Sequence, residues 1–181
     1  MNREIKGLIN NEDPVNHWSF LPVDGETILD LGSGINSEFT PTPMYWIQKN
    51  AKKVYGVDPS QESYEWYKNN FNVKNFIQIM DYVDRTEKFE IYFNVVKPTV
   101  AKIDVEGSEI FMNAMRPEFL EGCRHIGIEY HNLSCLLSCE HLLRDNGYEL
   151  YYYKFPHLDI DYQGVLHAHK KNVIVKQRTG I

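Results

Sequence analysis

Three ionisable side chains occupy alternate positions near the end of an apolar segment: Lys102, Asp104 and Glu106. Alternate residues of a strand point to the same face, so a strand here would bring the three side chains together. Charged groups are seldom buried unless they are paired or take part in function. The spacing therefore predicts either an ion pair inside the protein or a reactive site at the end of a core strand.

Acidic residues follow other apolar segments in the same way. Asp30, Asp58 and Asp81 come at the ends of predicted strands, and a further strand ends in the polar segment 129–132 (Glu-Tyr-His-Asn). In open α/β sheets, ligands bind beyond the carboxyl ends of the strands. The distribution of acids thus predicts a ligand site along one rim of a sheet.

The elements that must position these residues follow from the apolar pattern and the turn residues. Predicted strands cover 27–34, 52–60, 75–83, 98–107, 125–131, 148–155 and 171–178. Predicted helices cover 40–50 with Thr42 as N-cap, 61–70, 108–115, and 134–147 with Ser134 as N-cap. This alternation predicts an α/β fold with a doubly wound, mostly parallel sheet, ending in an antiparallel edge hairpin with a loop of about fourteen residues.

Composition limits the possible classes of protein. The chain of 181 residues contains no Gly/Ser/Pro-rich linker, so we expect one domain over 1–181, with 1–24 as a lead-in that contains a short helix near 3–10. The net charge of −6 disfavours a broad phosphate-binding surface and hence nucleic acid. Three cysteines, no signal-like start and no long apolar segment predict a cytoplasmic protein with free thiols and no membrane insertion.

A nucleotide-like ligand is indicated by the first predicted loop. Gly32 and Gly34 follow a strand, and Asp58 ends the next strand, where an acid can accept hydrogen bonds from a ribose. The third glycine of a dinucleotide fingerprint is replaced by Ser37, and no P-loop is present. Asp30 would repel a phosphate but suits a cation, so S-adenosylmethionine fits best: it carries a ribose and a positive amine but no phosphate.

The strings LDLGSG, VYGVDPS, KIDVEGSE and IEYH resemble those of the FkbM-type S-adenosylmethionine-dependent methyltransferases, a class I family, over roughly 27–153. The resemblance implies a seven-stranded sheet whose last strand is antiparallel. In the segment 35–40 the chain departs from the usual glycine-rich continuation.

The resemblance also implies cofactor contacts. The methionine end would lie against Asp30 and the loop of Gly32, Ser33 and Gly34. Asp58 would bind the ribose hydroxyls with Pro59 beside the adenine, and Asp81 and Tyr82 would also meet the adenine, Asp81 at its amino group.

The acceptor half of the site is predicted at the ends of the fourth and fifth strands. Methyl transfer to a hydroxyl needs the acceptor to be positioned and benefits from a base. Asp104 and Glu106 are candidates for contact with the acceptor, and His131 has a suitable intrinsic pKa for a general base. Lys102 is a candidate member of the same site, or alternatively pairs with a neighbouring acid inside the sheet.

Metal chemistry is a minor alternative, and we predict no metal. Asp104, Glu129 and Asn132 together offer oxygen ligands for Mg²⁺ or Ca²⁺. A zinc site is disfavoured because no CxxC is present and the cysteines lie among leucines. His167 and His169 precede a basic segment, for which a solvated edge strand is the simpler interpretation.

The leading hypothesis is therefore O-methylation of a small molecule, a sugar or a glycan. An RNA ribose methyltransferase is a second hypothesis, which the acidic charge disfavours. A third hypothesis is a non-catalytic protein that keeps the fold and binds a partner.

Overall fold

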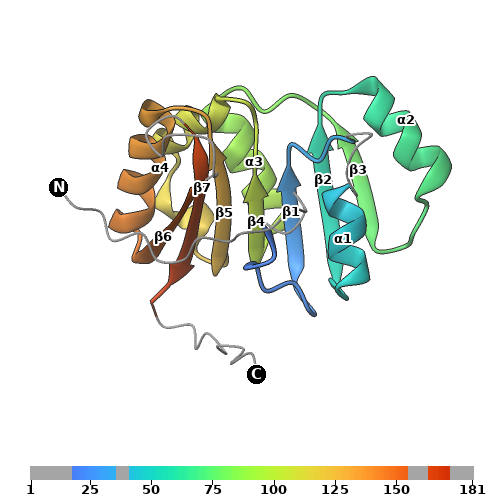
Figure 1. Ribbon diagram of the computed structural model, residues 1–181, viewed down its shortest axis with the longest axis horizontal. Coiled ribbons are helices and arrows are strands. Elements are labelled where there is room, and N and C mark those ends of the chain that lie inside the picture. Colours follow the sequence, from blue (N-terminus) through green and yellow to red (C-terminus); the bar gives the residue numbers. More distant parts are fainter. Residues whose placement is uncertain (1–17, 36–40, 155–162, 172–181) are drawn as a thin grey trace.

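Seven strands form a single sheet in the computed structural model, which describes residues 18–35, 41–154 and 163–171 (Figure 1). The strands are β1 (Thr27–Leu31), β2 (Lys53–Asp58), β3 (Phe76–Met80), β4 (Val100–Ile103), β5 (His125–Tyr130), β6 (Tyr148–Lys154) and β7 (Gly164–Lys170). Their order in the sheet is β3-β2-β1-β4-β5-β7-β6. β1 to β5 pair in parallel, whereas β7 is antiparallel to both β5 and β6. The predicted α/β fold class with an antiparallel edge hairpin is confirmed.

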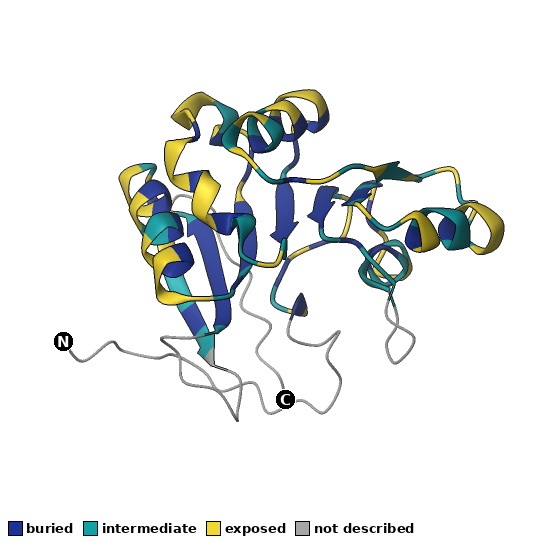
Figure 2. Cartoon of the chain, turned by 90° about the horizontal axis from the view of Figure 1, so that it is seen from above, coloured by how far each residue is buried: buried dark blue, intermediate teal, exposed yellow. Residues whose placement is uncertain are grey.

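Helices cover both faces of the sheet. They are α1 (Thr42–Gln48), α2 (Gln61–Asn70), α3 (Thr86–Val96), the 3₁₀ helices η2 (Ser108–Ala114) and η3 (Pro117–Leu120), and α4 (Leu133–Asp145). Two apolar clusters, one on each face, fill the space between these layers. α3 and α4 cover the larger cluster, and α1 with the chain before β1 covers the smaller one. The central strands are buried, and the outer sides of the helices are exposed (Figure 2).

Helix starts are set by local side chains. The Ser60 hydroxyl accepts a hydrogen bond from the Ser63 amide at the start of α2. The Asn132 side chain accepts from the Cys135 amide, so the N-cap of α4 lies two residues before the predicted cap at Ser134. Pro41, not Thr42, occupies the N-cap position of α1, because the Thr42 hydroxyl binds Asp30 instead.

The direction of strand succession reverses between β1 and β4. From β1 the chain proceeds to β2 and β3 on one side, and from β4 to β5 on the other. In doubly wound sheets, ligands bind at such a switch point, here beyond the carboxyl ends of β1 and β4. The site residues predicted from the sequence lie along this rim.

Two predicted elements differ from the structure at the C-terminus. The last strand of the sheet is β7 (Gly164–Lys170), which lies in the segment that was predicted to be a long loop before a strand at 171–178. Residues 172–178 lie outside the described residues. His167 and His169 are buried in β7 between β5 and β6. The solvated edge strand that was expected for the basic segment after them stays a prediction from residue 172 onward.

The sequence analysis also missed α3, which lies between β3 and β4. Phe89, Tyr92 and Phe93 bury one side of α3 against the sheet. The fourth strand ends at Ile103, earlier than predicted, because Glu106 and Gly107 have positive φ angles and turn the chain away from the sheet. The predicted helix near 3–10 lies outside the described residues. None of the described helices is long and apolar enough to cross a membrane.

Candidate functional site

Lys102 lies at the centre of the rim and is 2% exposed. Its Nζ donates to the carbonyl of Gly32 at 2.6 Å and lies 3.4 Å from Asp30 Oδ1 and 3.3 Å from Asp104 Oδ2. Burial alone would lower the pKa of Lys102, but Asp104 and Asp30 outweigh this effect and raise it. Lys102 is therefore a buried cation that fastens the loop after β1 to the end of β4.

Asp30 is fully buried and connects β1 to α1. Its Oδ2 accepts hydrogen bonds from Thr42 Oγ1 at 2.6 Å and from Trp46 Nε1 at 2.8 Å. Its carboxylate thus faces protein groups on several sides. The contact predicted between Asp30 and the methionine end of a cofactor stays a prediction, and the observed bonds give Asp30 a positioning role in the loop.

The loop 32–34 approaches β4 and β2 closely. Gly32 has a φ of 77°, and a Cβ at this position would lie 1.7 Å from the Asp104 carbonyl oxygen. The Ser33 side chain is buried and accepts a hydrogen bond from Gln78 Nε2 at 3.1 Å, while the Ser33 carbonyl accepts one from Tyr67. The Ser33 side chain and carbonyl therefore connect the loop to β3 and α2.

Asp58 and Gly34 face each other across the opening. The Asp58 Oδ1 accepts a hydrogen bond from the Ser60 amide at 2.9 Å. A Cβ on Gly34 would lie 2.8 Å from Asp58 Oδ2. Pro59 is exposed beside them. The missing side chain at Gly34 therefore leaves space next to one carboxylate oxygen of Asp58.

Asp81 and Tyr82 lie at the end of β3. The Asp81 carboxylate accepts hydrogen bonds from the side chains of Lys88 and Tyr92 of α3 and from the Tyr82 amide. Burial would raise the pKa of Asp81, but these hydrogen bonds hold it below its ordinary value. Tyr82 is exposed. The structure therefore presents an ionised carboxylate and an exposed aromatic ring at this end of the rim.

A second cluster lies at the ends of β4 and β5. His131 Nε2 is 3.3 Å from Glu106 Oε2 and 3.8 Å from Asp104 Oδ1. On the other side of the ring, Nδ1 is 3.3 Å from Glu109 Oε1. The structure thus brings together three of the four predicted catalytic residues around one imidazole, and Lys102 contacts the cluster through Asp104.

The protonation of His131 bears on its predicted role as a general base. The hydrogen-bonding carboxylate of Glu109 raises the pKa of His131 to about 9, against the opposing effect of burial, and Asp104 and Glu106 add to the rise. The imidazole is then cationic at neutral pH in this arrangement. An imidazole accepts a proton only in its neutral form, so the carboxylates of Asp104 and Glu106 are better placed to accept a proton.

Glu109 is the residue that the sequence analysis did not assign to the site. It is fully buried, and its Oε1 accepts a hydrogen bond from the Val105 amide at 2.9 Å. Its position in the first turn of the predicted helix 108–115 indicated only a favourable helix-dipole interaction. It lies in η2, which packs against α4 and α3.

The alternative ligand sets predicted from the sequence are engaged in other contacts. Asn132 caps α4, and Glu129 Oε1 accepts from Gln163 Nε2 at 2.7 Å. Burial, with the charge of Asp104, raises the pKa of Glu129 to about 7. Cys135 and Cys139, the cysteines that lie among leucines, are core residues, and the side chain of His141 is exposed beside Asp145.

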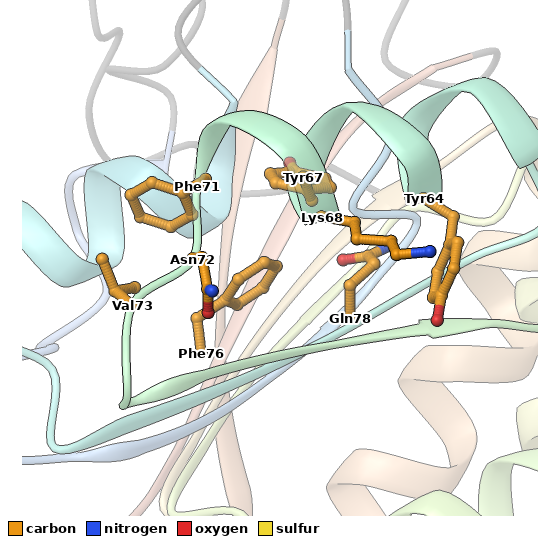
Figure 3. Close-up of a pocket in the computed structure, with 8 residues that line it drawn as sticks. All are labelled: Tyr64, Tyr67, Lys68, Phe71, Asn72, Val73, Phe76 and Gln78. Atoms are coloured by element: carbon orange, nitrogen blue, oxygen red, sulfur yellow. The ribbon is translucent and has the colours of Figure 1, made fainter.

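A separate cavity of about 220 Å³ lies between α2 and β3 (Figure 3). Its walls are largely aromatic, with Tyr64, Tyr67, Phe71 and Phe76 among the lining residues. Tyr67 and Gln78 line this cavity and also hold Ser33. The cavity therefore lies next to the buried supports of the glycine loop.

Comparisons with known proteins identify the fold. No protein-family model and no curated protein sequence matches the chain. Among solved structures, precorrin-6y C5,15-methyltransferase from Geobacter metallireducens is similar with a TM-score of 0.62 and 14% identity, over 93% of each chain. Magnesium protoporphyrin IX methyltransferase from Synechocystis PCC 6803, with bound S-adenosylmethionine, has a TM-score of 0.52 and 15% identity, over 81% of this chain and 71% of that one.

A candidate tRNA methyltransferase from Streptococcus pneumoniae, in complex with S-adenosyl-L-methionine, gives a TM-score of 0.56 at 13% identity, over 82% of this chain and 67% of that one. All these similarities lie below 25% identity, and they therefore support a shared fold and nothing finer. The chain has the Rossmann-like fold of the class I S-adenosylmethionine-dependent methyltransferases.

Proposed function

We propose that the protein binds S-adenosylmethionine and transfers its methyl group to a hydroxyl of a small molecule, a sugar or a glycan. The single observation that carries the proposal is the arrangement of Asp58 opposite Gly34 at the switch point of the sheet. Support comes from the similar structures that contain S-adenosylmethionine and from the resemblance of the KIDVEGSE segment to the FkbM-type family.

In this proposal Asp58 accepts hydrogen bonds from the ribose hydroxyls beside Pro59. The ionised carboxylate of Asp81 accepts from the adenine amino group, and the exposed ring of Tyr82 packs against the base. The loop from Gly32 to Gly34 holds the methionine end together with Asp30, which pairs with Lys102, the residue that binds the Gly32 carbonyl.

The acceptor lies against the cluster of Asp104, Glu106 and His131. A carbon–oxygen bond forms to the methyl group while the carbon–sulfur bond breaks, and the sulfonium becomes the neutral thioether of S-adenosylhomocysteine. The proton of the hydroxyl passes to a carboxylate of Asp104 or Glu106. Positioning accounts for much of the rate in such a displacement.

An RNA acceptor is the second candidate because a structurally similar protein is a candidate tRNA methyltransferase. The net charge of −6 favours a sugar or glycan acceptor over RNA, because RNA binding depends on a basic surface. Release of S-adenosylhomocysteine with a panel of sugars and glycans, compared with RNA, separates the two candidates.

The decisive test of cofactor binding is calorimetric titration of S-adenosylmethionine. We expect Asp58→Ala to weaken binding at least tenfold, because each lost hydrogen bond to a charged group is worth about 1.5–3 kcal/mol. Glu121→Ala, which removes an exposed acid elsewhere, is the matched control and should bind normally. Equal affinity of wild type and Asp58→Ala would overturn the ribose assignment, and no binding by the wild type would overturn the proposed function.

A further inference from the structure

We propose that Asp104, Glu106 and His131 bind a divalent first-row transition-metal ion, with Zn²⁺ as the reference ion. They are the one group of three or more histidine, cysteine or acidic residues in the described part of the chain whose ligand atoms lie within 4.8 Å of one another. The site differs from the oxygen-only set of Asp104, Glu129 and Asn132 considered from the sequence.

The three ligand atoms lie within 4.8 Å of one another, and the two distances from His131 Nε2 are close to those in a metal site. His131 Nε2 lies 3.3 Å from Glu106 Oε2 and 3.8 Å from Asp104 Oδ1. Bonds of about 2.0–2.2 Å in a tetrahedral site place two ligand atoms about 3.3–3.6 Å apart. An ion between these atoms therefore requires only small side-chain shifts.

The surrounding contacts aim the ligands. His131 Nδ1 faces Glu109 Oε1 at 3.3 Å, which leaves Nε2 directed at Asp104 and Glu106. Metal-binding histidines generally donate their second nitrogen to a carboxylate or carbonyl in this way. On the other side, Asp104 Oδ2 is held by Lys102 at 3.3 Å, which leaves Oδ1 toward the cluster.

The burial of Glu109 is an independent indication of a cation at this place. Glu109 is fully buried, and its Oε2 has no hydrogen-bond partner among the described residues. A buried carboxylate is costly unless a positive group is near it. A positive charge on the His131 ring, whose Nδ1 lies 3.3 Å from Glu109 Oε1, meets this requirement, and either a proton or a metal ion on Nε2 provides that charge.

The donor set selects the type of metal. Mg²⁺ and Ca²⁺ prefer oxygen ligands alone, whereas one imidazole nitrogen with two carboxylates suits Zn²⁺, Mn²⁺ or Fe²⁺. Two carboxylates also neutralise the charge of a divalent ion. Because the Glu106 side chain is 84% exposed, the remaining coordination positions face solvent, as in catalytic rather than structural zinc sites.

The role of the ion rests on the proposed function, whereas its binding does not. With the ion bound, Asp104 and Glu106 are its ligands and no longer the proton acceptors. A hydroxyl of the acceptor would occupy an open position on the ion, which lowers the pKa of the hydroxyl, and the proton would leave to water. The resulting alkoxide is the nucleophile that attacks the methyl group.

The test uses the full chain after treatment with a chelator and removal of that chelator. Co²⁺ is added in the absence of S-adenosylmethionine and its visible absorption is recorded, and Zn²⁺ binding is then measured by calorimetry. We expect one ion per chain. Glu106→Gln should weaken binding at least tenfold, and Glu109→Gln should weaken it 10- to 100-fold, the range typical of outer contacts to a metal ligand.

Glu121→Gln, which changes an exposed acid outside the cluster, controls for unspecific binding and should bind the ion like the wild type. Glu106→Gln is the critical variant because its exposed side chain leaves the fold intact. The absence of one-to-one binding, or the same affinity in Glu106→Gln and wild type, would overturn the metal site. A protein that binds S-adenosylmethionine but no metal overturns only this inference, and one that binds metal but no S-adenosylmethionine overturns only the proposed function.

Discussion

At the scale of single residues, Lys102 and Glu106 have opposite roles although they belong to one short segment. Lys102 is buried and connects Asp30, Asp104 and the Gly32 carbonyl. Glu106 is exposed and faces His131. Lys102 therefore supports the rim, whereas Glu106 is available to a ligand.

We expect Lys102→Met to destabilise the protein by about 3–5 kcal/mol, because removal of one partner leaves a buried carboxylate without its cation. Urea unfolding measures the change. The matched variant is Asp30→Asn/Lys102→Met, in which the unpaired charge is absent, so its loss should be smaller than the sum of the two single losses. Additive losses would show that Lys102 and Asp30 are not coupled.

The expected behaviour of Glu106→Gln differs. Its melting temperature and its affinity for S-adenosylmethionine should equal those of the wild type, whereas formation of S-adenosylhomocysteine with a verified acceptor should fall by about 10²-fold or more. Asp104→Asn should also lose transfer, with some loss of stability because Asp104 pairs with Lys102. Full turnover by Glu106→Gln would remove it from the site.

At the scale of elements, Gly32 and Ser33, the first loop residues after β1, are fixed by contacts with three neighbours. The Gly32 and Ser33 amides both donate to the Val57 carbonyl of β2, and Tyr67 of α2 donates to Ser33. β4 approaches so closely that only glycine fits at position 32. The loop is therefore held in place by the fold before any ligand binds.

The two glycines of this loop should respond differently to substitution. Gly32→Ala combines a strained positive φ with a clash against the Asp104 backbone, so we expect a loss of about 3–5 kcal/mol in unfolding free energy. Gly34→Ala meets only the carboxylate end of Asp58 and should mainly reduce cofactor affinity. Thermal unfolding and calorimetry on the same samples measure both effects.

Gly25→Ala is the control for backbone strain, because its φ is 74° and nothing lies within 4 Å of the added Cβ. It should cost about 1–2 kcal/mol. If Gly32→Ala costs no more than Gly25→Ala, the close approach of β4 is not limiting.

At the scale of the whole molecule, a group of histidines lies inside the sheet away from the rim. His125 of β5 and His167 of β7 are buried, with His125 Nδ1 3.5 Å from His167 Nε2. Burial lowers the pKa of His125 to about 4 and that of His167 to about 3. The neighbouring charges of His169 and Arg124 act in the same direction on His125, and Glu26 opposes them.

These pKa values predict how stability depends on pH. Both histidines take up protons in the unfolded state below about pH 6.5 but remain neutral in the folded state until about pH 4. Stability should therefore fall as the pH drops from about 6.5 toward 4, by up to about 1.4 kcal/mol per pH unit for each histidine.

Urea unfolding of the wild type between pH 5 and 7.5, compared with His125→Leu/His167→Leu, measures this contribution. The double variant should show a flatter dependence in this range. Equal slopes would mean that other groups dominate the acid sensitivity.

The sequence was sufficient for the features that depend on local pattern. Alternating apolar segments and turn residues predicted the parallel sheet and its C-terminal hairpin, and Gly32, Gly34 and Asp58 predicted where the chain turns at the rim. It failed for α3 and for β7. In β7, histidines occupy alternate positions, and an imidazole is equally compatible with a solvated face and with a buried one.

Only the tertiary structure decided which charged groups meet. Lys102 pairs with Asp30, which is 72 positions earlier in the chain, because β1 and β4 are neighbours in the sheet. Glu109 reaches His131 because η2 packs against α4, which begins just after His131. Ser33 faces inward because Gln78 and Tyr67 bind it there. Burial and ion pairing between distant segments depend on the packing of strands and helices, so local spacing placed these residues at the rim but could not assign their partners.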